Sequence, residues 1–266
     1  MGASHRTLKH ACLTLSLVVL SGVCNAENLW QGKRAAISLT YDDSLNVHLD
    51  KVVPALNRHD MKGTFYLTIN VPPLAERLNE WRQVAEQGHE LGNHTLFHPC
   101  NGQGAGREWV AAERDLSQWT AQRMVDNIKV ANTTLQAIDG KTERTLAFPC
   151  GDTSAGGESY VDAIKPLFVG ARGVHASYPT PDQVAQYNIA AHMINGQSIG
   201  QLQTMVDNAI ANQGLLVFLF HGVGGEHGLN LDEPTHLKLL NYLSNKQSDL
   251  WIAPMVDIAQ FIDQQE

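Results

Sequence analysis

The sequence predicts a single α/β domain folded as a distorted (β/α) barrel of parallel strands. Three observations support this fold class. Runs of β-branched and aromatic residues alternate with segments of helical apolar spacing along most of the chain. The strand-like runs number about eight, as in a (β/α) barrel. The 266 residues, 43% hydrophobic and 17% charged, suit one large globular domain better than two smaller ones.

The first 26 residues have the pattern of a signal peptide and are set aside from the fold. Arg6 and Lys9 precede an apolar run, Ala11–Val23, which is too short for a comfortable membrane span. Cys24-Asn25-Ala26 then provides a small-residue cleavage site. Lipoprotein processing at Cys24 is the weaker alternative, because a valine precedes this cysteine. We therefore expect an exported protein, periplasmic or extracellular, with no stable membrane span.

Eight strands are expected where β-branched, aromatic or continuously apolar residues are bounded by charged residues, Gly or Pro. In chain order they are Ala35–Tyr41, Gly63–Ile69, His89–Asn93, Thr145–Phe148, Leu167–Arg172, Tyr187–Met193, Leu215–Phe220 and Leu250–Ala253. Their alternation with helices indicates a parallel sheet, because each helix returns the chain to the same edge.

Six helices are expected from apolar residues at helical spacing. In chain order they are Val47–His59, Leu74–Gln87, Trp119–Ile138, Ser198–Asn212, Thr235–Ser244 and Val256–Ile262. Pro54 predicts a kink in the first helix, and Gly88 ends the second. The segment Pro99–Arg107, rich in Gly, Asn and Gln, is expected to be a long loop of the kind that carries function.

The charge of the chain disfavours one class of partner. The full chain has 19 basic and 27 acidic residues, a net charge of −8. Without residues 1–26 it has 17 basic and 27 acidic residues, a net charge of −10. Since so acidic a domain is a poor non-specific binder of polyanions, we expect no nucleic-acid partner.

Two adjacent carboxylates, Asp42 and Asp43, directly follow the first expected strand. Neighbouring side chains of an extended chain point to opposite faces, so the two are expected to have different roles. The alternative is a turn or a helix cap, with Asp43 capping the helix that follows.

Two histidines, His94 and His98, follow the third expected strand. On a helical turn, residues at this spacing share one face, so the pair could bind one metal ion. With Asp43 they would form a His₂Asp set that leaves positions open for water and substrate, as catalytic sites do. The alternative for each histidine is a structural role in the core.

A third polar position, His221, comes directly after the apolar run Leu215–Phe220 and before a glycine-rich turn, Gly222–Gly225. A histidine at this point of a barrel lies at the catalytic rim, and imidazole is suited to general acid catalysis. The alternative is a histidine that caps a turn or helix.

The motifs T-Y-D-D at Thr40–Asp43, H-T-L-F-H at His94–His98 and L-F-H-G at Leu219–Gly222 occur in this order. The set resembles the signature of the polysaccharide deacetylases, metal-dependent carbohydrate esterases related to chitooligosaccharide, chitin and peptidoglycan deacetylases. The resemblance extends from Ala35 to the C-terminus and implies a distorted (β/α) barrel. It makes residues 27–266 a deacetylase-like catalytic domain.

The resemblance implies a role for each matching residue. Asp42 corresponds to the general base and His221 to the general acid. Asp43, His94 and His98 correspond to the ligands of a divalent metal, with zinc first and cobalt, nickel or manganese as alternatives. The implied activity is hydrolysis of a non-peptide C–N bond, which removes N-acetyl groups from a poly- or oligosaccharide. The same site could cleave O-acetyl esters.

The third motif of the family is altered here, at Phe148–Gly151. Many members have an arginine before the proline and an aromatic residue after it, where this chain has Phe148 and Cys150. By resemblance the backbone of Cys150 belongs to the oxyanion and substrate part of the site. The absent arginine leaves open how the base carboxylate, Asp42, is held, and Arg172, at the end of a later strand, is the candidate to supply the replacement charge.

Only Cys100 and Cys150 remain once the signal peptide is removed. In an oxidising compartment they are candidates for one disulfide, and two unpaired buried thiols are the alternative. If the family's barrel holds, both segments reach the same rim, and we expect a bridge that shapes the active site.

Two other functions remain open. Gly196–Gly200 matches the G-x-S-x-G pattern of serine esterases, which would make Ser198 a nucleophile. Ser198 followed by Gln201 is also a capping box, and this interpretation is preferred. The second alternative is a carbohydrate-binding relative that has lost catalysis, which only the altered third motif favours.

Overall fold

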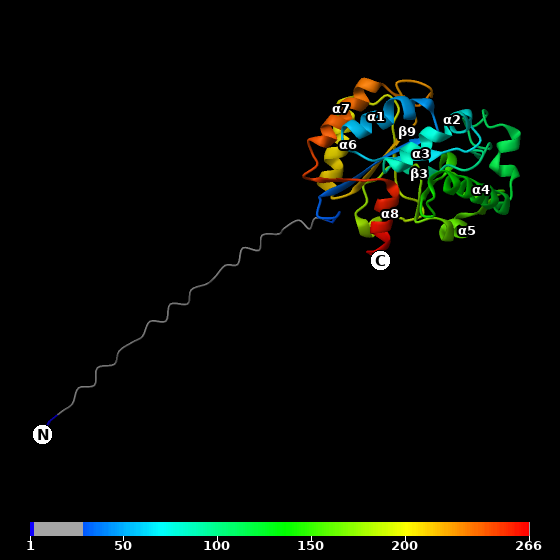
Figure 1. The fold of residues 1–266 in the computed structure, drawn as a ribbon. Coiled ribbons are helices and arrows are strands. Elements are labelled where there is room, and N and C mark those ends of the chain that lie inside the picture. Colours follow the sequence, from blue (N-terminus) through cyan, green and yellow to red (C-terminus); the bar gives the residue numbers. More distant parts are fainter. Residues whose placement is uncertain (3–28, 266) are drawn as a thin grey trace.

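The computed structural model describes residues 1–2 and 29–265 (Figure 1). Apart from its first two residues, the predicted signal peptide therefore lies outside the described part of the chain. Within that part, no helix is both long enough and apolar enough to cross a membrane.

An eight-stranded sheet forms the centre of the molecule, and all its pairings are parallel. The order is β7-β4-β3-β2-β1-β9-β8, with β12 also paired to β1. The strands are β1 (Ala35–Asp42), β2 (Thr64–Leu67), β3 (Glu90–Asn93), β4 (Thr145–Ala147), β7 (Gly170–Arg172), β8 (His192–Met193), β9 (Leu215–Phe220) and β12 (Leu250–Ile252). Each expected strand is present. The parallel α/β fold is confirmed.

The strand β1 is the hub of this sheet. It pairs with β9 over six residues, from Ala36↔Leu215 to Tyr41↔Phe220. Its other edge is shared, since β12 pairs with its first half and β2 with its second half. An isolated parallel bridge between Arg172 and Ile189 links β7 to the segment before β8, which curves the sheet towards a closed barrel.

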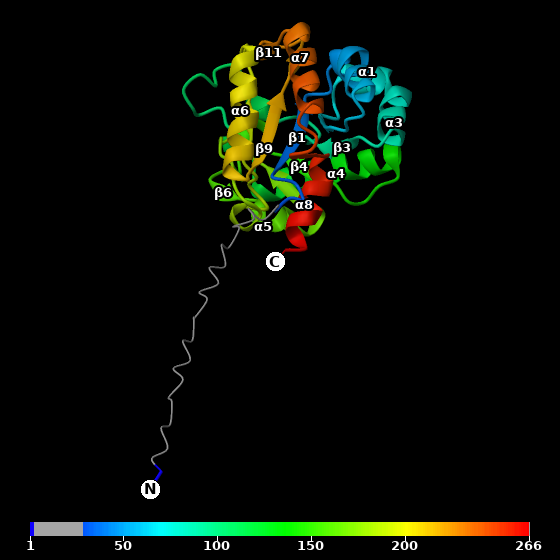
Figure 2. The same ribbon diagram turned by 90° about the vertical axis from the view of Figure 1, so that its left-hand side faces the viewer.

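Helices surround the sheet (Figures 1 and 2). They are α1 (Val53–Arg58), α2 (Pro72–Glu76), α3 (Leu78–Glu86), α4 (Ala121–Asp139), α5 (Val161–Ile164), α6 (Ile199–Asn212), α7 (Glu233–Ser244) and α8 (Met255–Asp263). A π-helical turn, His48–Val52, precedes α1, so Pro54 stands in the first turn of α1 rather than at a kink inside one helix. The single helix expected over Leu74–Gln87 is divided at Arg77 into α2 and α3.

The alternation of side chains along β1 explains why its end reaches the barrel interior. Ile37, Leu39 and Tyr41 belong to the core cluster that includes residues of α1, α3, α6 and α7, on one face of the sheet. Ala36 belongs to a second cluster on the other face. By the same alternation Asp42 follows Ala36, with its side chain towards the barrel interior.

Two short pairings lie outside the expected elements. The strands β5 (Ser154–Ala155) and β6 (Glu158–Ser159) form an antiparallel hairpin. The strands β10 (Gly222–Val223) and β11 (Asn230–Leu231) pair parallel to each other and bound the loop after His221.

Candidate active site

A cavity of about 270 Å³ lies at the carboxyl ends of β1, β3 and β9. Its walls combine ionisable side chains with apolar ones: Asp42, Asp43, His94, His98, Arg107, Trp109, Phe148, Cys150, Val174, Met193, Leu219, His221, His227 and Leu229. The structure thus brings together six of the seven residues proposed from sequence for catalysis, metal binding and the oxyanion region. In a parallel α/β fold this edge of the sheet is the usual place of the active site.

Asp42 is almost fully buried and forms an ion pair with Arg172, with Oδ2 and Nη2 2.5 Å apart. Burial alone would raise the pKa of Asp42, but the Arg172 guanidinium, with smaller contributions from His94 and His221, lowers it. Asp42 is therefore ionised at neutral pH. Among the described residues its Oδ1 has no hydrogen-bond partner, although this atom is buried.

Arg172, the candidate to replace the charge missing from the third motif, is paired with Asp42. Its side chain is fully buried, lies over the ring of Tyr66 and donates to Gly173 O as well as to Asp42. Because it does not line the cavity, Arg172 does not reach a substrate there. The sequence analysis grouped Arg172 with the oxyanion and substrate residues and also proposed it as the replacement charge for the base carboxylate. Its observed contact is with the carboxylate of Asp42.

The side chain of Asp43 enters the same cavity as that of Asp42, which the extended-chain argument did not predict. Asp43 has a φ of 80° and Ser44 a φ of 56°. This left-handed backbone, which Asp tolerates better than most residues, ends the strand alternation and turns the second carboxylate back towards the first. The helix-cap alternative for Asp43 is wrong, since the residue that begins the following helix is Val47 and it has no side-chain cap.

His94 and His98 converge on Asp43, but not on a helical turn as expected. The segment after β3 is a tight loop with positive φ at Thr95 (69°) and His98 (50°). Thr95 Oγ1 accepts a hydrogen bond from the His98 N–H, and this contact closes the loop. The two imidazole rings lie edge to face with centroids 4.6 Å apart.

The donor set fits a divalent cation. Asp43 Oδ1 lies 3.6 Å from His94 Nε2 and 3.5 Å from His98 Nε2. Two ligands of one tetrahedral zinc are separated by about 3.4 Å, given bond lengths near 2 Å. The three ligand atoms lie within 4.8 Å of one another and leave the cavity side open.

A backbone contact prepares His94 for this role. Its Nδ1 lies 2.9 Å from Ala147 O, at the end of β4. Since a carbonyl can only accept, the proton is on Nδ1 and the lone pair is on Nε2, which faces Asp43. Burial lowers the pKa of His94 to about 4, so the ring is neutral, as a metal ligand must be.

His221 enters the cavity from the end of β9, on the other side of Asp43. Its Nε2 is 3.9 Å from Asp43 Oδ2, and the side chain is 12% exposed. Burial lowers the pKa of His221, against the opposing effect of Asp42 and Asp43. The fully buried His48 contacts the His221 carbonyl at 2.8 Å through Nε2, which fixes the backbone that carries the ring. Sequence reasoning missed His48.

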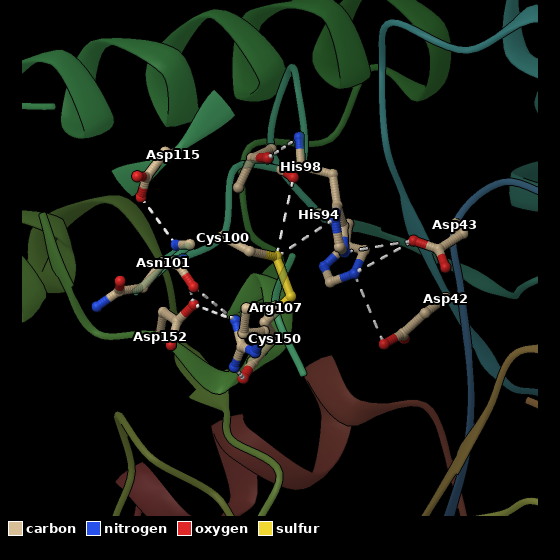
Figure 3. Close-up of a disulfide and its surroundings, with 12 residues drawn as sticks. Asp42, Asp43, His94, His98, Cys100, Asn101, Arg107, Asp115, Cys150 and Asp152 are labelled. Atoms are coloured by element: carbon tan, nitrogen blue, oxygen red, sulfur yellow. Dashed lines mark hydrogen bonds and ion pairs between the residues drawn. A yellow bond between two sulfur atoms is a disulfide. The ribbon is translucent and has the colours of Figure 1, made fainter. Parts of the chain in front are cut away.

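The structure joins Cys100 and Cys150 in a disulfide, with Cα atoms 5.8 Å apart. Figure 3 shows the bridge between the metal-site candidates and a polar cluster around Asp152. Arg107 forms an ion pair with Asp152 at 2.9 Å and donates to Cys150 O at 3.2 Å. The long loop after His98 is therefore fastened to the third motif both covalently and electrostatically.

Ser198 lies at the N-cap of α6 and is exposed. Its Oγ accepts from the Gln201 N–H, and the Gln201 side chain accepts from the Ser198 N–H. The capping interpretation is confirmed. Ser198 does not line the cavity that holds His221.

Sequence reasoning missed His227, which lies in the loop between β10 and β11. Its ring stacks on His221 with centroids 4.6 Å apart and an interplanar angle of 11°. The available signal was a second histidine in the glycine-rich stretch that follows β9. Three apolar side chains at the cavity were also unassigned and are exposed: Trp109 (62%), Val174 (37%) and Met193 (43%).

Comparison with known proteins supplies the family. Residues 31–162, which contain Asp42, Asp43, His94 and His98, match the polysaccharide deacetylase family. The chain belongs to the polysaccharide deacetylase family. The family acts on glycan substrates and generally depends on a metal ion.

This polysaccharide deacetylase chain matches only part of its curated relatives. It is 24% identical to a gellan lyase of Bacillus sp over 265 residues, covering 90% of this chain and 10% of that protein. It is 28% identical to the peptidoglycan-N-acetylmuramic acid deacetylase PdaA of Bacillus subtilis over 118 residues, covering 44% of this chain and 38% of PdaA. The chain thus matches well under two thirds of the length of either relative.

Solved structures agree with the fold. The structure of Bacillus subtilis PdaA, a family 4 carbohydrate esterase, has a TM-score of 0.54 at 19% identity, covering 87% of this chain and 82% of that one. A polysaccharide-deacetylase-like protein of Pseudomonas aeruginosa PAO1 has a TM-score of 0.64 at 10% identity, covering 90% and 95%. At these identities the likeness establishes the fold, which is the barrel predicted from the sequence.

Proposed function

We propose that the chain is a metal-dependent hydrolase that removes N-acetyl groups, and O-acetyl groups where they occur, from a poly- or oligosaccharide. One observation carries the proposal. Two carboxylates and three histidines from the ends of three strands meet at one cavity, and the resemblance of the sequence motifs to the family implies a role for each of them. The similarity to PdaA favours peptidoglycan amino sugars as the first substrates to test.

Asp43, His94 and His98 would hold the cation. A bound zinc, or cobalt, nickel or manganese in its place, would polarise the acetyl carbonyl and acidify a neighbouring water. The apolar rim formed by Trp109, Val174 and Met193 would contact the less polar face of the sugar.

Asp42 would accept the proton of the attacking water. Its Oδ2 is held by Arg172, while Oδ1 is buried and has no partner among the described residues. The ion pair keeps the carboxylate ionised and fixes its orientation, so the remaining oxygen is available to the water. The lowered pKa of Asp42 extends this ability to acid pH.

His221 would protonate the departing amine. Its lowered pKa makes the protonated ring a stronger acid, and turnover on an acetamide should fall as the pH rises through that pKa. By resemblance to the family, the N–H of Cys150 would stabilise the oxyanion, and this residue lines the cavity. The disulfide holds that backbone in place.

Release of acetate from glycans tests the proposal. Chelator-treated protein should be inactive on chitin oligomers, peptidoglycan and acetylxylan, and added Zn²⁺ or Co²⁺ should restore activity on at least one. The variant His94→Ala/His98→Ala should bind no metal and release no acetate. Full metal content in this double variant would overturn the metal assignment.

Two outcomes would revive the alternatives. Activity that resists chelation and is lost in Ser198→Ala would identify a serine esterase instead. A protein that binds metal and glycan but releases no acetate from any of them would be a binding relative. The pairing of Arg172 with Asp42 works against this last interpretation, because it supplies the charge that the third motif lacks.

We also propose that the protein is exported. The disulfide between Cys100 and Cys150 supports an oxidising compartment, the periplasm or the cell exterior. Fractionation of the native host, with thiol titration of the purified protein, tests this: protein in the cytosolic fraction with two free thiols would contradict it.

A further inference from the structure

His227 is held in position by the loop that carries it. The preceding residue, Glu226, accepts a hydrogen bond from the Val47 N–H at 2.8 Å, which ties the loop to the chain after β1. On the other side, the Gly225 N–H donates to Asn230 Oδ1 at 2.8 Å. The ring is therefore presented to the cavity by an anchored segment, and its side chain is 33% exposed.

The hydrogen bonds of His227 fix which ring nitrogen bears the proton. The Leu229 N–H donates to Nδ1 at 3.0 Å, whereas Leu229 O lies farther from the same nitrogen, at 3.3 Å. Nδ1 is therefore the acceptor, and in the neutral ring the proton is on Nε2. This Nε2 lies 3.7 Å from Asp43 Oδ2.

The two oxygens of Asp43 face different partners. Oδ1 faces His94 and His98, the other two proposed metal ligands. Oδ2 faces the Nε2 atoms of His221 and His227, at 3.9 and 3.7 Å. Carboxylates that bind metals are commonly oriented by a hydrogen bond to the oxygen that does not bind. If His221 gives its proton to the leaving group, His227 is the remaining donor.

We propose that His227 is a positioning residue that holds the Asp43 carboxylate through its Nε2–H, with Oδ1 kept towards His94 and His98. The distance of 3.7 Å exceeds that of a hydrogen bond, and rotation of the partly exposed Asp43 side chain on cation binding closes it. The stacking of His227 on His221 sets the plane from which the proton is offered. This assignment rests on the proposed function, since it requires a cation at Asp43.

Measurements of metal affinity separate the role of the Nε2–H donor of His227 from the role of its aromatic ring. His227→Phe keeps an aromatic ring against His221 and removes the N–H, whereas His227→Gln keeps an N–H with similar reach and removes the ring. Co²⁺ and Zn²⁺ would be titrated into chelator-treated protein in competition with a chromophoric chelator, and the visible spectrum of bound Co²⁺ recorded. His59→Phe, on the outer surface at Asn241, is the matched control.

We expect His227→Phe to bind either metal about 10- to 100-fold more weakly, the usual cost of losing such a partner, and to change the Co²⁺ spectrum. His227→Gln should recover most of the affinity and the original spectrum, and His59→Phe should match the parent. Parent-like affinity and spectrum in His227→Phe would overturn the proposal, as would equal loss in His227→Gln and His227→Phe with both folded. A parent protein that binds neither metal would refute the proposed metal centre itself, so the two failures are distinguishable.

Discussion

Two buried carboxylates in the same sheet show how similar groups acquire different roles. Glu90, at the start of β3, accepts four hydrogen bonds. Thr145 donates to its Oε1 twice, from N–H and Oγ1, at 2.7 Å each. Thr64 Oγ1 and the Val256 N–H donate to its Oε2 at 2.8 and 2.9 Å. Glu90 thereby joins three strands to the first turn of α8, and all its acceptor capacity is used in the fold.

Asp42 lies at the opposite end of the sheet and is equally buried. It has one strong partner, Arg172, and its Oδ1 has no partner within the described residues. His221 Nδ1 and Arg172 Nε are buried and unpaired in the same way. Unmade hydrogen bonds of this kind cost about 1–3 kcal/mol each. The number of satisfied acceptors, rather than burial or charge, distinguishes the structural carboxylate, Glu90, from the proposed catalytic one, Asp42.

The largest expected effect is a loss of turnover when Asp42 is changed. Asp42→Asn should lower kcat by about 10²- to 10⁴-fold, because the amide cannot accept the proton of water. The variant should still fold and bind metal, as circular dichroism and metal analysis would show. A loss below tenfold would mean that another group is the base, and the contrast with Glu90 would fail.

The next largest effect is expected when the disulfide, which lies at the same end of the sheet as Asp42, is removed. Cys100 and Cys150 are 50 residues apart in sequence, and the chain-entropy model gives such a loop about 4 kcal/mol, less any strain. Cys100→Ser/Cys150→Ser should lower both Tm and kcat while metal content is retained, since no ligand is removed. Unchanged Tm and kcat would show that the candidate active site does not depend on the disulfide.

For Glu90, which accepts four hydrogen bonds, the expected effect of substitution is on stability alone. Glu90→Gln places an amide NH₂ against donors and should lower the free energy of unfolding by about 1–3 kcal/mol. Acetate release per folded molecule should stay at the parent rate, measured below the Tm of the variant. If kcat fell as far as in Asp42→Asn, counting acceptors would not separate the two roles.

The smallest effect is a pH dependence of opposite sign at the two ends. Burial outweighs its four donors and raises the pKa of Glu90 above its usual 4.5, so the contribution of this group is present at low pH and lost as the pH rises. Arg172 lowers the pKa of Asp42 below its usual 3.8, so that contribution is lost as the pH falls.

The free energies of unfolding of the two variants would be compared by urea unfolding of the metal-free proteins at pH values below and above 3.8 and 4.5. The destabilisation caused by Glu90→Gln should shrink as the pH rises above 4.5, and that caused by Asp42→Asn should shrink as the pH falls below 3.8. Parallel pH profiles for the two variants would contradict the assignment.

The sequence predicts strand ends well and loop geometry poorly. Asp42, Asp43 and His221 could be placed because each directly follows a continuous apolar strand, and parallel strands end at one edge. Arg172 was also found at a strand end, as the candidate charge for the base carboxylate, and the structure pairs it with Asp42. The helical turn expected for His94–His98 was wrong, because Thr95 and His98 adopt left-handed backbone that local spacing does not encode.

His227 is a second example of loop geometry that the sequence does not predict. Its sequence position, six residues after His221, does not reveal that the loop folds back. That fold depends on the Glu226–Val47 and Gly225–Asn230 hydrogen bonds, and the first of these spans 179 residues. Contacts of such sequence separation belong to the tertiary fold and leave no periodic signal.

The pairing of β1 with β9 also has a consequence for how the molecule folds. Thr40 Oγ1 donates to Phe218 O across 178 residues, so the hub strand is synthesised long before its main neighbour. Until β9 arrives, an apolar strand edge is exposed to other chains, and parallel pairing of such distant segments is slow. Truncation before residue 215 would remove His221 and this neighbour together. A fragment of that kind would keep every proposed metal ligand and yet be expected to aggregate before it could bind a cation.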